Sequence, residues 1–164
     1  MRRTDREVCG RQDLLAMIAR CKVCRLGLWD GDEVYIVPLN FGYEERDGGL
    51  SLFFHCAKEG RKLEILRANP KAAFEMDGDH LLIEGEAPCR YSYAYCSVMG
   101  QGTVEVLEDE ACKTHALSLI MRSQTSRDAV FTPAMARTVC VLRLSVTSIS
   151  GKLHAGPDEP HSHR

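Results

Sequence analysis

The sequence lacks a strong charge of one sign, a long apolar run and a hydrophobic leader. Its 21 basic and 23 acidic residues give a formal net charge of -2 over 164 residues, so no global field attracts nucleic acid or a membrane surface. No apolar run approaches the roughly 20 residues that cross a bilayer. No apolar stretch follows the basic residues near Met1, as it would in a signal peptide. We therefore expect a cytoplasmic protein that binds neither nucleic acid nor membranes.

The eight cysteines include no second close pair that would complete a zinc site. Cys21 and Cys24 form the one C-x-x-C motif, and a structural zinc ion usually needs two more Cys or His ligands at short spacing. A thioredoxin-type pair follows a strand and opens a helix, whereas this pair ends a helical pattern and enters a strand. We therefore predict reduced cysteines that pack as small apolar side chains, and no metal site.

The length and composition suit one domain with a substantial core. Hydrophobic residues make up 45% and charged residues 27%, which is typical of a folded protein. Residues 153–164 are rich in Pro, Asp and His and predict a loose tail after a single domain over residues 1–152. His154, His161 and His163 lie in this tail, where no fold would preorganise them as metal ligands. We interpret them as incidental histidines.

Helical and strand patterns alternate along the chain without the rhythm of β-α-β units. Apolar spacing and turn residues predict helices over 4–21, 60–68 and 108–121, and strands over 25–29, 34–41, 50–55, 71–76, 92–106 and 137–149. Turns predicted at 30–32 and 46–49 would join the first three strands into an antiparallel meander, and another turn is predicted at 77–79. The pattern indicates a mainly β fold, a β-barrel with peripheral short helices, because closure removes exposed sheet edges.

Cations are concentrated where the third predicted strand meets a helix. Lys58, Arg61 and Lys62 follow His55 within seven residues, and Gly60 would let a backbone approach closely. The start of a helix carries unsatisfied N–H groups and a positive dipole end, so it favours an anion and opposes cations. Two interpretations remain open: a seat for a phosphate, or an ordinary solvated turn.

Two strands contain residues that are unusual in the middle of a sheet. Pro38 removes a hydrogen-bond donor, so it belongs on an edge strand, at a bulge or beside a ligand. Gly100 and Gly102 indicate a bend or a close backbone approach in the strand predicted over 92–106. A flat ring could lie on the interrupted strand, next to the cations.

Three segments carry a resemblance to a known family. The segments "VYIVPLNFGYE", "LFFHCAKEGRKLEILRANPKAAFEMD" and "YCSVMGQGTVEVLED" resemble the pyridoxamine 5′-phosphate oxidase-like FMN-binding split barrels, and within them the nitroimidazole-resistance (Nim-like) branch. The opening "MRRTDREV" and the closing "LRLSVTSISGK" are similar to that branch too. The resemblance implies an antiparallel split β-barrel with Greek-key connections, and a homodimer with FMN at the subunit interface.

The resemblance also implies a set of flavin contacts. The strand Val37, Pro38, Leu39 and Asn40 would lie along the isoalloxazine ring, and Lys58, Arg61 and Lys62 would hold the phosphate. Phe54 and His55 would end near the ring and the ribityl chain, while Ser97 would add a polar contact. His55 is either a proton donor or electrophile in catalysis, or a mere hydrogen-bonding partner of the ribityl chain.

These residues favour an FMN-dependent oxidoreductase that reduces a small organic acceptor, a nitroaromatic compound among the candidates. The chain lacks the arginine-bearing C-terminal segment of true pyridoxamine phosphate oxidases, so vitamin B6 oxidation is not expected. One alternative is a flavin-binding or redox-sensing module without turnover. Another is a haem-binding split barrel with His55 or His115 as the axial ligand. No G-x-G-x-x-G motif after a strand identifies a nicotinamide donor.

Overall fold

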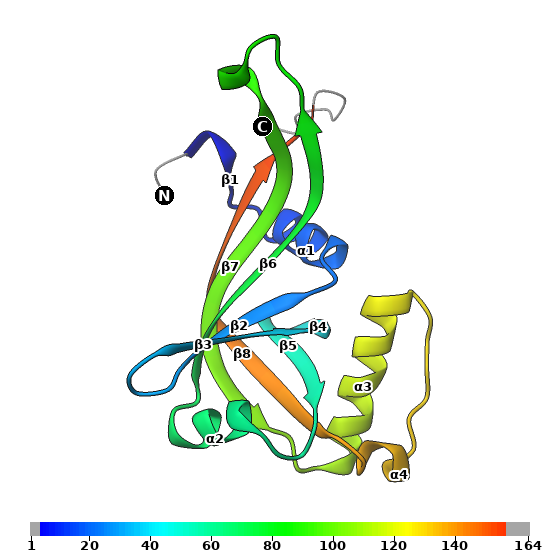
Figure 1. Ribbon diagram of the computed structural model, residues 1–164. Helices are drawn as coiled ribbons and strands as arrows, with labels where there is room; N and C mark the ends of the chain where they lie inside the picture. Colours follow the sequence, from blue (N-terminus) through cyan, green and yellow to red (C-terminus); the bar gives the residue numbers. More distant parts are fainter. Residues whose placement is uncertain (1–3, 157–164) are drawn as a thin grey trace.

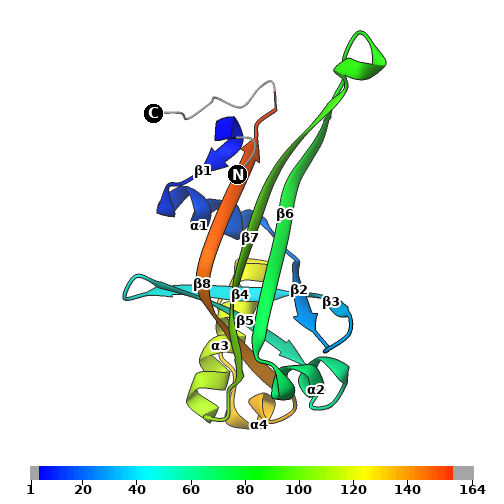
Figure 2. The ribbon, with the colours of Figure 1, turned by 90° about the vertical axis from the view of Figure 1, so that its left-hand side faces the viewer.

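The computed structural model describes residues 4–156 and is built on one antiparallel sheet that curls around a core (Figures 1 and 2). The strands follow the order β3-β2-β6-β7-β8-β5-β4, and a short β1 pairs with β8. The path ends at β3 and β4, so hydrogen bonds do not close the barrel in the described part of the chain. The prediction of a mainly β, antiparallel split barrel with peripheral short helices is confirmed. The strands are β1 (Glu7–Val8), β2 (Cys24–Trp29), β3 (Val34–Leu39), β4 (Phe41–Arg46), β5 (Gly49–Cys56), β6 (Lys71–Ile83), β7 (Ser92–Val106) and β8 (Cys140–His154).

Strand alternation divides the apolar side chains between two clusters. On β5, Phe54 is fully buried in the main cluster inside the barrel, together with Leu26 of β2 and Leu142 of β8. The neighbouring Phe53 points to the opposite face and packs against Ile120 of α3 (Glu110–Thr125). Successive side chains of a strand face opposite sides, so one strand serves both clusters. Figure 1 shows α3 alongside β4 and β5.

Strands β6 and β7 are longer than the barrel and form an arm that projects from it (Figure 2). The turn predicted at 77–79 is wrong, because β6 continues to Ile83 with only a register shift between Gly78 and Leu81. Asp79 has a φ of 56°, a conformation that aspartate tolerates well, and its carboxylate lies 2.9 Å from Arg20. Turn-type residues therefore form an irregularity within a strand here. The strand expected over 92–106 matches β7.

The predicted meander is also wrong. Strand β2 pairs with β3, and β4 pairs with β5, but these two hairpins lie at opposite ends of the sheet path. Asn40 separates β3 from β4, and its side-chain amide donates to the carbonyl oxygen of Lys22 at 3.1 Å and to Gln124 Oε1 at 3.1 Å. The chain therefore leaves the first hairpin at Asn40 and starts a second one elsewhere.

The helices are α1 (Arg11–Arg20), α2 (Arg61–Ala68), α3 and the single turn α4 (Pro133–Ala136). The predicted helices over 60–68 and 108–121 are confirmed within a few residues. The helix expected from residue 4 instead begins at Arg11, because Glu7 and Val8 pair with Lys152 and Gly151 of β8. No helix in residues 4–156 is long and apolar enough to cross a membrane.

Strand β8 carries Leu153 and His154, the first residues of the segment for which a loose tail is predicted. The His154 ring lies within hydrogen-bonding distance of the Tyr93 carbonyl oxygen (2.6 Å) and of the Arg6 guanidinium (3.2 Å). His161 and His163 lie outside the described residues, so the domain boundary stays a prediction. All eight cysteines are free thiols, and Cys21, Cys24, Cys56, Cys96 and Cys140 are buried.

Candidate functional site

The N-terminus of α2 lies against the β2–β3 hairpin. The Arg61 guanidinium is centred 5.0 Å from the Tyr35 ring. Its Nη2 and Nε lie 2.8 and 3.0 Å from Asp30 Oδ2, and it also pairs with Glu33. Gly60 precedes the helix with a φ of 130° and no side chain caps the N-terminus. Because a φ of this value is strained for other residues, the loop depends on glycine here.

Asp30 and Glu33 alter the charge that the N-terminus of α2 presents to a ligand. Hydrogen bonds from Arg61 to Glu33 and then to Asp30 raise the pKa of the guanidinium above its ordinary value. The cation is thus partly neutralised by partners within the chain, and an external anion is not needed to reconcile it with the helix dipole. A phosphate at this position would have to share Arg61 with Asp30 and Glu33.

Lys58 and Arg61 do not face one common site. Lys58 lines a cavity together with Arg67, Lys113 and Arg137, whereas Arg61 reaches the β2–β3 turn. The sequence grouped these two cations with Lys62, because they are close along the chain. The fold assigns them to different surroundings.

Strand β3 is an edge strand, since it pairs only with β2 in the described part of the chain. Pro38 stands opposite Arg25 and is exposed, so the prediction of an edge position is confirmed. Val37 and Leu39 alternate with it and are half-buried against the main core. An edge strand leaves backbone groups without a ladder partner, which are available to a ligand or a second chain.

Phe54 and His55 end β5 on opposite faces. Phe54 as a whole residue is 0% exposed within the main core, and its main chain lies between Phe41 of β4 and Leu142 of β8, so Phe54 presents no surface to a ligand in the described chain. His55 is exposed on the other face, but the surrounding protein desolvates the imidazole and lowers its pKa below the ordinary value. The neutral imidazole is therefore favoured near pH 7.

Ser97 lies on β7, opposite Asp77 of β6 and Lys152 of β8. Strands β6 and β2 separate it from β3, which is a span of about 14 Å at the usual spacing of strands. Ser97 is thus on the same sheet as Pro38 but not beside it. Within one chain the structure does not bring these two predicted contacts together.

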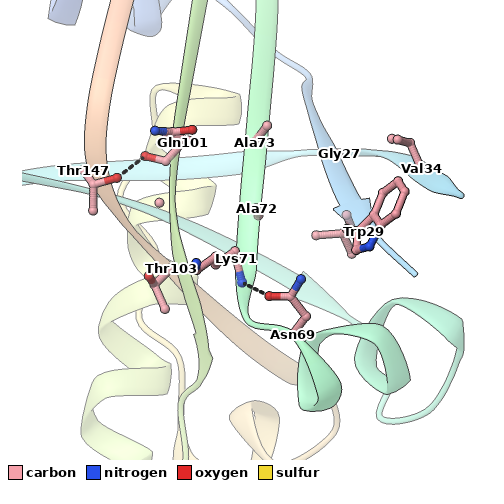
Figure 3. A pocket seen from close by; sticks show the side chains of 12 residues that line it. Gly27, Trp29, Val34, Asn69, Lys71, Ala72, Ala73, Gln101, Thr103 and Thr147 are labelled. Atoms are coloured by element: carbon pink, nitrogen blue, oxygen red, sulfur yellow. Dashed lines mark hydrogen bonds between the residues drawn. The ribbon is translucent and has the colours of Figure 1, made fainter. Parts of the chain in front are cut away.

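A cavity of about 630 Å³ hollows the outer face of the sheet (Figure 3). Its lining includes the small strand residues Gly27, Ala73 and Gly102, and the larger Trp29 and Val34. Sequence reasoning missed this hollow, although several small residues on adjacent strands signal it. Its remaining lining residues are Leu28, Asn69, Lys71, Ala72, Gln101, Thr103 and Thr147.

The glycines of β7 allow close contact with its neighbours. A Cβ on Gly102 would lie 2.1 Å from the Ser145 carbonyl oxygen, and one on Gly100 would lie 2.5 Å from the Phe74 ring. The prediction of a close approach is confirmed. The register between β7 and β8 also shifts between Gln101 and Gly102.

Comparison with known proteins adds to this geometry. The family model described as pyridoxamine 5′-phosphate oxidase matches residues 10–153. The chain belongs to this family. No curated protein sequence matches it significantly. Among solved structures, a candidate 5-nitroimidazole antibiotic resistance protein from Bacteroides thetaiotaomicron is 32% identical, with a TM-score of 0.77, over 89% of this chain and 85% of that one.

Two more distant structures share the family fold. A flavocytochrome from Azotobacter vinelandii is 18% identical with a TM-score of 0.75, over 99% of this chain and 75% of the other. A FAD and heme binding protein from Mycobacterium smegmatis is 22% identical with a TM-score of 0.75, over 94% and 77%. The resemblance to the pyridoxamine 5′-phosphate oxidase family, Nim-like branch, that the sequence motifs indicated is confirmed.

Proposed function

We propose that this protein is an FMN-binding flavoprotein and an oxidoreductase that reduces a small organic acceptor. The observation that carries the proposal is the meeting of the exposed edge strand β3 with the N-terminus of α2, where Arg61 lies over Tyr35. A flat ring can lie along an unpaired strand edge while its phosphate reaches the positive end of a helix. Family membership and the 32% identical relative support the same assignment.

The residues at α2 fit a phosphate, with one complication. Lys62 follows Arg61 in the first turn, and the N-terminus has no side-chain cap, so N–H groups and a cation are available there. Arg61 is held by Asp30 and Glu33, and these carboxylates would repel a phosphate. We therefore assign the larger share of phosphate binding to Lys62 and the helix N-terminus, with Arg61 as a shared partner, whereas Lys58 lines a different cavity.

The ring would lie along Val37, Pro38, Leu39 and Asn40, near the end of β5, where the His55 side chain is exposed. FMN supplies the electron transfer when it is bound. The chain's own part is to orient the ring on a rigid strand and to place a histidine at the end of β5. A neutral imidazole can donate or accept a hydrogen bond, so His55 would hold a proton at one ring nitrogen near the acceptor.

We further propose a cytoplasmic homodimer that completes the flavin site. The outer face of the sheet carries apolar side chains that one chain leaves exposed: Val34 is 62% exposed, Ile36 63% and Met99 52%. Exposed apolar side chains that cluster on one face are typical of an interface. In a dimer, Ser97 of one chain could approach a flavin that lies on β3 of the other.

The test starts with the colour of the purified protein. We expect the absorbance bands of oxidised flavin and the release of FMN, rather than FAD, on denaturation. Anaerobically reduced protein mixed with a nitroimidazole should be reoxidised while the absorbance of the nitro group falls. A colourless protein that takes up no FMN at micromolar concentration would refute the flavin assignment. Reduced protein that no nitroaromatic compound reoxidises would refute this choice of acceptor.

A further inference from the structure

A second cavity, of about 410 Å³, lies at the end of the barrel away from the projecting arm, between α2, α3 and the segment that leads into β8. Four separate parts of the chain contribute to it: the loop before α2 with α2 itself, the end of β7, the first turn of α3, and the residues around the start of β8. Its volume falls within the usual range for small-molecule pockets. It is lined by Lys58, Leu63, Arg67, Val106, Glu108, Lys113, Arg137, Val139 and Cys140.

The lining carries an excess of positive charge. Lys58, Arg67, Lys113 and Arg137 provide four cations, and Glu108 provides the one carboxylate of the lining. Arg137 pairs with Glu110 at 2.5 Å. Within residues 4–156, no ion pair engages the side chains of the other three cations. In a chain with a net charge of -2, this concentration favours an anionic ligand locally.

The wall beneath the cations is apolar. Leu63 is 2% and Cys140 7% exposed, and Val139 is half-buried beside them. Burial raises the pKa of the Cys140 thiol to about 11, so the thiol is uncharged near pH 7 and does not repel an anion. Val106 is 39% exposed at the rim, where an apolar ligand could cover it.

We propose that this cavity binds a small organic anion with a compact apolar body, such as an aromatic carboxylate or phosphate monoester. The anionic group would lie among Lys58, Arg67 and Lys113, and the body would rest on Leu63, Val139 and Val106. The site goes beyond the proposed flavin function. Arg61 and Lys62 do not line it, so the cavity shares neither of these cations with the proposed phosphate site.

The experiment is calorimetric titration of the purified full chain with phenyl phosphate and, in a second arm, benzoate. We expect one site per chain for at least one of the two, and the tighter one identifies the anionic group. Inorganic phosphate and benzyl alcohol should each bind at least tenfold more weakly than that ligand, because inorganic phosphate lacks the apolar body and benzyl alcohol lacks the anionic group. Equal affinity for either of them would overturn the proposal.

Variants test the position of the site. Lys113→Ala should weaken binding of the tighter ligand about tenfold, as the loss of one charge-assisted hydrogen bond implies. Lys113→Arg should recover most of the lost affinity. Arg127→Ala, which removes an exposed cation outside the cavity, should leave the affinity unchanged. Lys62→Ala should also leave the affinity for this ligand unchanged, although it should weaken FMN binding. Unchanged binding in a folded Lys113→Ala variant, or binding lost in Lys62→Ala, would place the ligand elsewhere.

Discussion

The Arg61 guanidinium lies 5.0 Å from the centre of the Tyr35 ring. This contact joins the N-terminus of α2 to the edge strand β3, although the two residues are far apart in sequence. Asp30 and Glu33 hold the guanidinium from the same hairpin. Arg61, which the sequence suggested as a phosphate ligand, therefore also links α2 to the β2–β3 hairpin.

Lys62→Ala should weaken FMN binding about tenfold or more, because Lys62 is the cation of the first turn of α2 that no carboxylate holds in the described structure. A smaller effect is expected for Arg61→Ala, because Asp30 and Glu33 already engage its guanidinium. Fluorescence quenching of FMN measures both affinities. A larger loss of FMN affinity in Arg61→Ala than in Lys62→Ala would show that Arg61 leaves Asp30 and Glu33 to bind the phosphate.

Removing the two carboxylates should strengthen FMN binding. The double variant Asp30→Asn, Glu33→Gln leaves Arg61 available and removes repulsion of the phosphate, so we expect an increase in affinity of about threefold, in keeping with the modest energy of exposed ion pairs. Asp128→Asn, which breaks the exposed pair with Arg122, is the matched control. Weaker FMN binding in the double variant would mean that the ion pairs of Arg61 with Asp30 and Glu33 matter more for positioning α2 than for repelling the phosphate.

The pH dependence of stability should carry a contribution from His55. Its pKa in the folded protein lies below the ordinary value of about 6.5, so between the two values the unfolded chain binds more protons. Linkage then lowers the free energy of unfolding as the pH falls from above 6.5 through this window. Urea unfolding between pH 7.5 and 5 should show a smaller decrease for His55→Gln. An NMR titration that places the His55 pKa at or above 6.5 would contradict this expectation.

Gly42→Ala should destabilise the fold, because a Cβ at Gly42 would lie 2.5 Å from the Ile120 backbone nitrogen of α3. Backbone cannot yield as a side-chain end does, so α3 must shift, at a cost of about 1–3 kcal/mol in the free energy of unfolding. Gly27→Ala is the control, since its Cβ would meet nothing closer than 3.9 Å. Denaturant unfolding that finds equal stabilities for the two variants would disprove the close packing of α3 on β4.

Ile36→Glu should dissociate the proposed dimer without unfolding the chain. Ile36 is 63% exposed on β3, so a charge there is tolerated in a monomer but costly in an apolar interface. Val130→Glu places the same charge on a residue that is 93% exposed in the loop after α3, and should leave the dimer intact. Sedimentation velocity separates the two states. A wild-type monomer would refute the dimer, and a dimeric Ile36→Glu variant would exclude this face as the interface.

Local patterns predicted the elements whose form depends on near neighbours. The alternation from Ser92 to Val106 defines β7, and the apolar spacing of Leu63, Ile65 and Leu66 defines α2. The same patterns misassigned residues 77–79, because Asp and Gly form an irregularity in a strand with the chemistry that they use in a turn. They also missed the hollow on the outer sheet face, which needs Gly27, Ala73 and Gly102 to be adjacent.

The sequence by itself determined the periodicity of the chain, its edge-strand proline and the motifs that place it in its family. Only the tertiary structure decided which hairpin meets which helix, and hence that Arg61 faces Asp30 and Glu33 while Lys58 faces another cavity. Arg61 is separated from these carboxylates by 31 and 28 residues. Such contacts depend on how the sheet folds back on itself rather than on local spacing, so neighbours in sequence can serve different sites.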